Sequence, residues 1–121
     1  MSKIEDMDEF KDMTRGERLL AEGLANRYFV MYVLKNDTEQ NRLGISVSKK
    51  VGNSVIRHHL TRLVRESYRL HEDMFNSGLD IVVIARGAAK EITYHQTESA
   101  LLHLGGLHNI IVKTEKKMES F

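Results

Sequence analysis

The clearest alternation of hydrophobic and polar positions runs over residues 42–48, RLGISVS. Successive side chains of a β-strand point to opposite faces, so this period of two predicts a strand with one buried face. The apolar face carries Leu43, Ile45 and Val47, and the small or polar face carries Arg42, Gly44, Ser46 and Ser48.

Two further stretches have the composition of strands. Residues 28–35, YFVMYVLK, are aromatic and β-branched, which predicts a strand with Phe29 in the core and with Tyr28 and Tyr32 together on the other face. Residues 79–85, LDIVVIA, form an apolar run bounded by glycine on both sides. A strand without polar alternation is typical of the middle of a sheet, so we expect this strand to be covered on both faces.

The period changes to that of a helix after Gly52-Asn53, which ends the strand before it. Asn53 or Ser54 can cap a helix that continues to about Leu70. The predicted buried face of this helix is formed by Ile56, Leu60, Leu63, Val64 and Ser67.

Helical spacing also appears on both sides of this central region. Residues 8–22 have acids in the first turn and are followed by Gly23, which favours a helix ending there. Residues 92–104 place Tyr94, Thr97, Leu101 and Leu104 on one face. The pair Gly105-Gly106 is expected to be a weak point of that helix or to end it. The order helix, strands, helix, strand, helix predicts an α+β or α/β sandwich of three to four strands.

The composition limits the class of protein. A chain of 121 residues suggests one domain, residues 1–121. There is no cysteine, no apolar segment long enough to span a membrane and no pattern of a secretory signal. We therefore expect a cytoplasmic protein without a membrane partner, and a frayed polar tail over residues 113–121.

The net charge of +1 conceals a strong local asymmetry. Residues 42–69 hold seven Lys or Arg against one acid, Glu66, whereas residues 1–25 hold four against seven. On the predicted central helix, one face combines His58, Arg62, Arg65 and Arg69 at spacings of four, three and four. A helix of about 17 residues is about 25 Å long, so these side chains can follow a phosphate backbone. A helix face that is merely solvated usually pairs acidic with basic side chains at i,i+4 spacing, and this face lacks such pairs over most of its length.

The residues of this basic region resemble a known family. Residues 44–67, GISVSKKVGNSVIRHHLTRLVRES, are similar to the signature of the bacterial ribonuclease P protein component: a strand, Ser-Lys-Lys, a hydrophobic-Gly-Asn turn and a helix ending in Arg-Glu. Residues 25–32 resemble its first long strand, residues 78–86 resemble its last strand, and Tyr94 opens a similar final helix. The resemblance covers roughly residues 24–108.

The resemblance implies an α+β two-layer sandwich in the order α-β-β-β-α-β-α, with a left-handed β-α-β crossover. It also implies a non-catalytic subunit, likewise cytoplasmic and one per RNA, for a ribozyme that removes the 5′ leader of precursor tRNA with magnesium held by the RNA. The residues expected to contact the catalytic RNA are Lys49, Lys50, Asn53, Arg57, His58, His59, Arg62, Arg65 and Arg69. The residues expected in a cleft for the leader are Tyr32, Arg42, Ser46 and Ser48.

The chain departs from the family pattern at several positions. Arg57-His58-His59 replaces Arg-Asn-Arg, and Thr61 stands where a lysine is usual. Residues 1–23 are a divergent segment that is acidic where the family is basic. With Gly23 aligned on the family glycine, the positions of the family's cleft aromatics fall at Gly16 and Leu20.

Three other interpretations stay open on the sequence. The basic helix is also compatible with a general binder of structured or double-stranded nucleic acid that has no role in processing. A protein nuclease would need an acid positioned beside His58 or His59, and Glu66 is about two turns of helix away. An impaired family member is the third. The histidines lack the i,i+4 spacing of a helical metal pair, so we expect no metal site in the protein itself.

Overall fold

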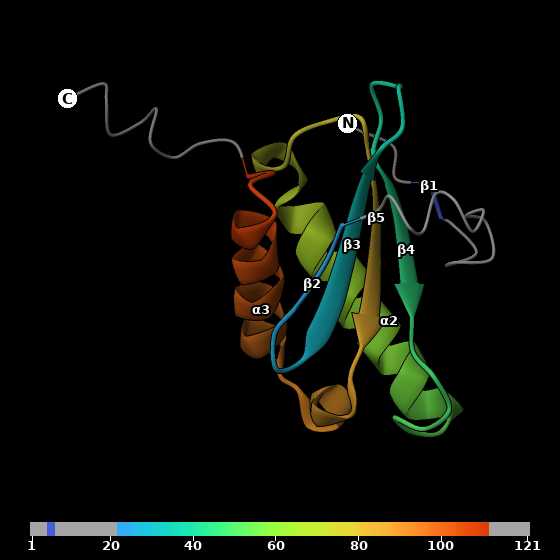
Figure 1. Cartoon of the computed structure of the whole chain (residues 1–121). Coiled ribbons are helices and arrows are strands. Elements are labelled where there is room, and N and C mark those ends of the chain that lie inside the picture. The colour runs from blue at the N-terminus through green and yellow to red at the C-terminus, as the bar shows by residue number, and fades with distance from the viewer. Residues whose placement is uncertain (1–4, 7–21, 112–121) are drawn as a thin grey trace.

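The computed structural model describes residues 5–6 and 22–111, which form a sheet with two long helices (Figure 1). The strands are β1 (Glu5–Asp6), β2 (Glu22–Ala25), β3 (Phe29–Lys35), β4 (Arg42–Ser46) and β5 (Leu79–Ala85). The helices are α2 (Ser54–Leu70) and α3 (Tyr94–Leu107), with short 3-10 turns η2 (Glu72–Met74) and η3 (Gly87–Glu91).

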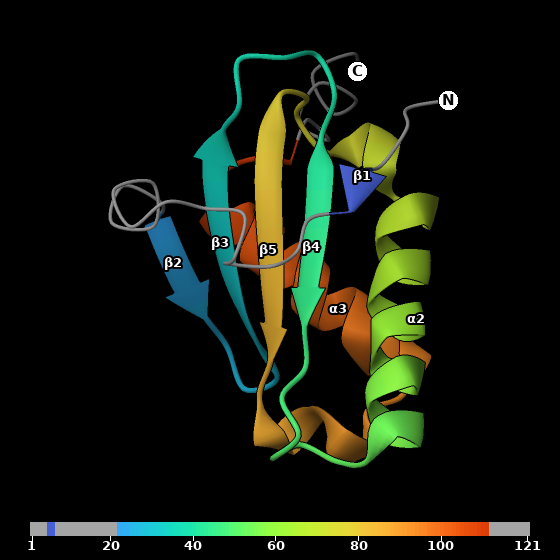
Figure 2. The same ribbon diagram turned by 90° about the vertical axis from the view of Figure 1, so that its right-hand side faces the viewer.

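The sheet has the strand order β1-β4-β5-β3-β2, so β5 lies at its centre. β5 pairs parallel with β4 and antiparallel with β3. Both long helices cover the same side of the sheet and leave the other side facing the viewer in Figure 2. The connection from β4 through α2 to β5 is a left-handed crossover, which is the rare hand for parallel strands.

The main core lies between the sheet and the helices. Phe29, Met31 and Leu43 point into it from the strands, and α2 and α3 supply Leu60, Val64, Leu101 and Leu104. Burying these side chains is the main stabilising term of such a sandwich. A smaller apolar cluster lies on the other face, around buried Val82 on β5. The prediction that residues 79–85 are a strand covered on both faces is confirmed.

The buried side-chain amide of Asn41 joins three parts of the chain. The Asn41 side chain donates to the Tyr68 hydroxyl at 2.6 Å and to the Asn76 carbonyl at 2.9 Å, and it accepts from the Leu79 backbone N–H at 2.8 Å. Asn41 is 5% exposed, so these bonds satisfy polar groups that water does not reach. They connect the residue before β4 to α2 and to the first residue of β5.

The predicted α+β sandwich is confirmed. β2, β3, β4, α2, β5 and α3 follow the implied order after its first helix, and β1 is an additional short strand at the sheet edge. The helix predicted over residues 8–22 lies outside the described residues except for its last residue, Glu22, which begins β2. The predicted tail over residues 113–121 also lies outside them.

Three boundaries or orientations differ from prediction. β4 ends at Ser46 rather than Ser48, because the chain turns there toward α2. α3 continues through both glycines to Leu107: a Cβ at Gly105 would come within 2.8 Å of the Ile111 side chain, so the glycine lets that residue and Phe75 pack closely against the helix. Tyr28 precedes β3 in a bend and packs against the main core, whereas Tyr32 joins the cluster around Val82.

Candidate RNA-binding surface

The turn before α2 presents two lysines to solvent. The Val51 N–H donates to the Ser48 carbonyl at 3.0 Å, and the Lys50 N–H donates to the Ser48 hydroxyl at 3.3 Å. Val51 is buried and anchors the turn in the core, while Lys49 and Lys50 are exposed. A Cβ at Gly52 would come within 2.7 Å of the Ile56 side chain, so the chain passes this close to α2 only with glycine there.

The first turn of α2 is capped and has no acid. The Asn53 side chain accepts from the Ile56 N–H at 3.0 Å, as expected for an N-cap residue. The free N–H groups and the helix dipole make such an end positive, and no carboxylate in the first turn offsets this. The start of α2 is therefore suited to an anion.

The cationic face of α2, defined by His58, Arg62, Arg65 and Arg69, lies away from the core. His58 and Arg62 are exposed, as is the neighbouring His59, and Arg65 is half-buried. Arg69 is exposed but donates to Glu66 at 2.8 Å, so part of its charge is already neutralised. Among the described residues, no carboxylate forms an ion pair with Arg57 or Arg62.

A groove of about 270 Å³ separates the start of α2 from the end of β4. Arg57 and His58 line its helix side, and Ile45 and Val47 line its sheet side. Arg57 is half-buried, and its Nε has no hydrogen-bond partner among the described residues. A buried donor without a partner is costly, which favours an acceptor from a bound molecule at this position.

The four residues predicted for a leader cleft are only partly brought together. Tyr32, Arg42 and Ser46 lie on the sheet face opposite the helices, with Tyr32 and Gly44 both beside Val82. Ser48 lies beyond the end of β4, in the turn before α2. The Tyr32 ring lies against β2, since a Cβ at Gly23 would come within 2.5 Å of it.

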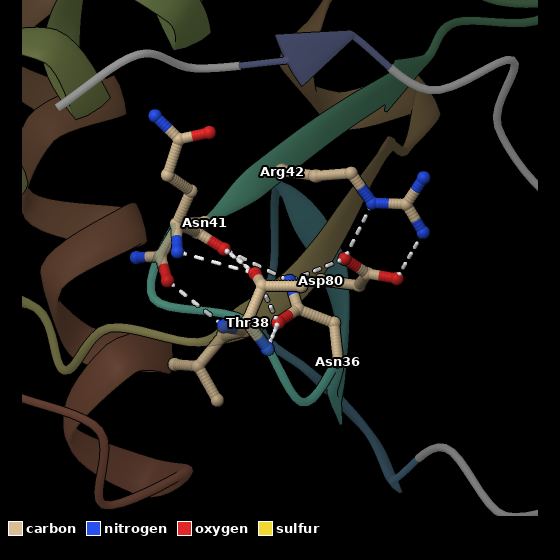
Figure 3. Close-up of polar contacts among 7 residues, drawn as sticks. Asn36, Thr38, Asn41, Arg42 and Asp80 are labelled. Carbon is tan, nitrogen blue, oxygen red and sulfur yellow. Dashed lines mark hydrogen bonds and ion pairs between the residues drawn. The ribbon is translucent and has the colours of Figure 1, made fainter.

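Arg42 forms a bidentate pair with Asp80 of β5 (Figure 3), with distances of 2.8 Å from Nε to Oδ1 and 2.6 Å from the second nitrogen to Oδ2. Asn36 also donates to Asp80, at 2.9 Å. Burial raises the pKa of Asp80, but the hydrogen bonds from Arg42 and Asn36 and the charge of Arg42 outweigh it, and the pKa lies below its ordinary value. Asp80 was not among the predicted site residues, although one acid inside an apolar strand signals a buried partner.

Comparisons with known proteins agree with this geometry. The family model described as Ribonuclease P matches residues 2–107. The ribonuclease P protein component of Lachnoclostridium phytofermentans is 60% identical over 91 residues, which cover 75% of this chain and 78% of the relative. This chain belongs to the bacterial ribonuclease P protein family. Its relative from Clostridium botulinum is 42% identical over 112 residues, which cover 89% of this chain and 97% of the relative.

Solved ribonuclease P proteins have the same fold. The protein from Staphylococcus aureus matches with a TM-score of 0.79 and 35% identity, over 91% of this chain and all of that one. The protein from Thermotoga maritima matches with a TM-score of 0.73 and 31% identity, over 80% and 92% of the two chains. The resemblance found in residues 44–67 is therefore confirmed as family membership.

Two further properties of this ribonuclease P family member follow from the part of the chain that the structure describes. Neither α2 nor α3 is both long and apolar enough to cross a membrane. Within residues 5–6 and 22–111, no three His, Asp or Glu side chains gather where they could hold a metal ion.

Proposed function

We propose that this protein is the RNA-binding subunit of ribonuclease P and that α2 contacts the catalytic RNA. The relatives are named as the protein component of that enzyme, which implies a partner that is not protein. The observation that supports the proposal most directly is the exposed cationic face of α2, together with Lys49 and Lys50 in the turn before it. Such a surface binds RNA through its phosphates and needs no base-specific contact.

The protein then assists a reaction that the RNA performs. The expected magnesium belongs to the RNA, and the protein contributes positive charge and shape. The groove beside Arg57 accepts a phosphate from the catalytic RNA, because a guanidinium with an unpaired, buried N–H is a strong donor to phosphate oxygens. The face with Tyr32 and Ser46 is the candidate contact for the single-stranded leader of precursor tRNA, with the ring as a stacking surface.

A protein nuclease fits the geometry less well. Glu66 is the single acid of α2, and its carboxylate is bound to Arg69. It is therefore not available as a partner for His58 or His59 in acid–base chemistry.

The test is the substitution Arg62→Ala, measured as the affinity for a bacterial ribonuclease P RNA over a range of salt concentrations. Loss of one phosphate contact should weaken binding and reduce the slope of log K against log salt by about one. Arg69→Ala is the matched control, because its guanidinium is partly neutralised by Glu66 and the expected change is smaller. Equal slopes for the wild type and Arg62→Ala would refute the proposed contact.

Cleavage assays separate the proposed role from general nucleic-acid binding. Addition of the protein to the catalytic RNA should raise removal of the 5′ leader at low magnesium, and Arg62→Ala should lower this gain. A random RNA duplex should compete poorly. Competition equal to that of the catalytic RNA would instead support a general binder, and cleavage by protein free of RNA would support a nuclease.

A further inference from the structure

A second groove lies between α3 and the bend that joins β2 to β3. Its volume is about 420 Å³, larger than that of the groove beside Arg57. In Figure 1, α3 and the bend lie on the opposite side of the molecule from the start of α2. We name it the α3 groove; its walls are formed by Asn26, Arg27, Tyr28, His95, Gln96, Ser99, Ala100 and His103.

One wall of the α3 groove is held in place by Asn26. Its side-chain oxygen accepts from the N–H groups of Tyr28 and Phe29, at 3.1 and 3.0 Å. Its side-chain nitrogen donates to the Ala100 carbonyl of α3 at 3.0 Å, and its own carbonyl accepts from Arg86 at 2.7 Å. The bend is thus tied to the helix and to the end of β5, so the groove is formed before any ligand arrives, which lowers the entropic cost of binding.

The side chains of the α3 groove have the chemistry of a nucleotide site. The Arg27 guanidinium lies over the Tyr28 ring, with its carbon 5.7 Å from the ring centroid. Arg27, His95 and His103 offer nitrogen donors and Ser99 offers a hydroxyl, and none of the described residues that line the groove carries a carboxylate. Among the described residues, no acid forms an ion pair with Arg27.

The carboxylate of Glu98 lies near one residue of the groove, His95. It lies 3.9 Å from His95 Nδ1, but its other oxygen lies 3.0 Å from His71 Nε2. The stronger of these two contacts therefore holds Glu98 on the side of α2. His103 Nδ1 lies 3.4 Å from the Asn26 side-chain nitrogen, which leaves its other ring nitrogen and the Arg27 guanidinium for a ligand.

We propose that the α3 groove binds one unpaired nucleotide of an RNA. The phosphate binds the Arg27 guanidinium and the neighbouring donors of the groove, which are the imidazoles of His95 and His103 and the hydroxyl of Ser99. The base stacks on the Arg27 guanidinium and the Tyr28 ring. Only the choice of RNA as the source of the nucleotide rests on the proposed function. The groove is a second contact, separate from α2.

The test follows backbone amide NMR signals of Arg27, Ser99 and Ala100 while a five-nucleotide oligoadenylate is added. These signals should shift in the wild type. Ser99→Glu places a carboxylate in the groove and should bind about tenfold more weakly than Ser99→Gln, which has a similar size, also lacks the hydroxyl and carries no charge. Arg27→Ala should also weaken binding about tenfold, and Lys90→Ala, which removes an exposed cation outside the groove lining, should not.

The outcomes distinguish this site from α2. Arg62→Ala should leave the shifts at Ser99 and Ala100 unchanged even if it weakens binding of the catalytic RNA. Equal affinity of Ser99→Glu and Ser99→Gln would overturn the proposed site. Binding of adenosine 5′-monophosphate without binding of the oligoadenylate would overturn RNA as the source of the nucleotide.

Discussion

At the scale of single residues, Asn41 holds together parts of the chain that are distant in sequence. Its three hydrogen bonds reach residues 27, 35 and 38 positions away. Tyr68, one of these partners, is also packed against Phe75, with ring centroids 5.0 Å apart. Burial raises the pKa of the Tyr68 hydroxyl, the hydrogen bond from Asn41 lowers it and the charge of Glu72 raises it, with a net increase. The hydroxyl therefore stays protonated.

Asn41→Leu tests this role. Leucine has nearly the same size but offers no polar atom, so the Leu79 N–H and the Asn76 carbonyl would lose their partner in a buried environment. We expect the free energy of unfolding in urea to fall by about 3 kcal/mol. The control is Thr38→Val on the exposed loop, where water replaces lost hydrogen bonds and the change should stay below about 1 kcal/mol. If Asn41→Leu lowered the free energy of unfolding as little as Thr38→Val does, water would have to satisfy the Leu79 N–H and the Asn76 carbonyl.

The lowered pKa of the Asp80 carboxyl group predicts that the stability of the fold depends on pH. Its pKa in the folded protein lies below the ordinary value, so folding favours the carboxylate form. Its stabilising effect is complete above the unfolded-state pKa of about 4, and it disappears as the pH falls through the lower, folded-state value.

We therefore expect wild type to be more stable than Asp80→Asn at pH 7, by about 1–2 kcal/mol, and the difference to shrink in acid. Urea unfolding at pH 7 and at several values below pH 5 measures it. Asp37→Asn is the control, because Asp37 is exposed and has a positive φ of 61° that Asn tolerates. A difference that does not change with pH would contradict the role of the Asp80 carboxylate.

At the scale of elements, α2 has a buried apolar face and an outward cationic face. Leu60 and Val64 are buried in the core, and the cationic face lies opposite to them. A helix can separate the two because its period of 3.6 residues sorts side chains by direction. The positive charge of α2 therefore costs little in packing, and at Arg57 and Arg62 no described carboxylate pairs with it.

The histidine at position 59 gives a prediction for α2. A guanidinium carries a permanent charge and five donors, and the resemblance places arginine at this position in the family. His59→Arg should bind the catalytic RNA several times more tightly, with a salt slope steeper by about one. The comparison variant His59→Gln, uncharged, should show neither gain. An unchanged slope for His59→Arg would place residue 59 away from the RNA.

At the scale of the whole molecule, the crossover determines where the positive charge lies. The left-handed path from β4 to β5 places α2 at the β4 side of the helical layer, while α3 lies toward β3 and β2 (Figures 1 and 2). One side of α2 then packs on the core and the other faces outward. Six of the seven basic residues of positions 42–69 thus belong to α2 or to the turn before it, although the net charge of the chain is only +1. The seventh, Arg42, lies on the opposite face of the sheet and pairs with Asp80.

The sequence by itself determined the elements and the charge of α2. The period of the apolar residues predicted β4 and α2, because periodicity reports the local geometry of the backbone, and the unbroken apolar run of residues 79–85 predicted β5. The Gly-Asn turn predicted where that helix starts, and the excess of Lys and Arg over acids predicted its cationic face. These features depend on residues a few positions apart, which a sequence displays directly.

Only the tertiary structure decided which side chains meet across the fold. Tyr28 turned toward α3 rather than toward Tyr32, because Asn26 ties the bend to Ala100, 74 positions away. Arg42, predicted for RNA, is bound by Asp80, 38 positions away. Periodicity contains no information on such distant pairs. Their geometry follows from the register of the strands and the packing of α3, which exist only once the chain is folded.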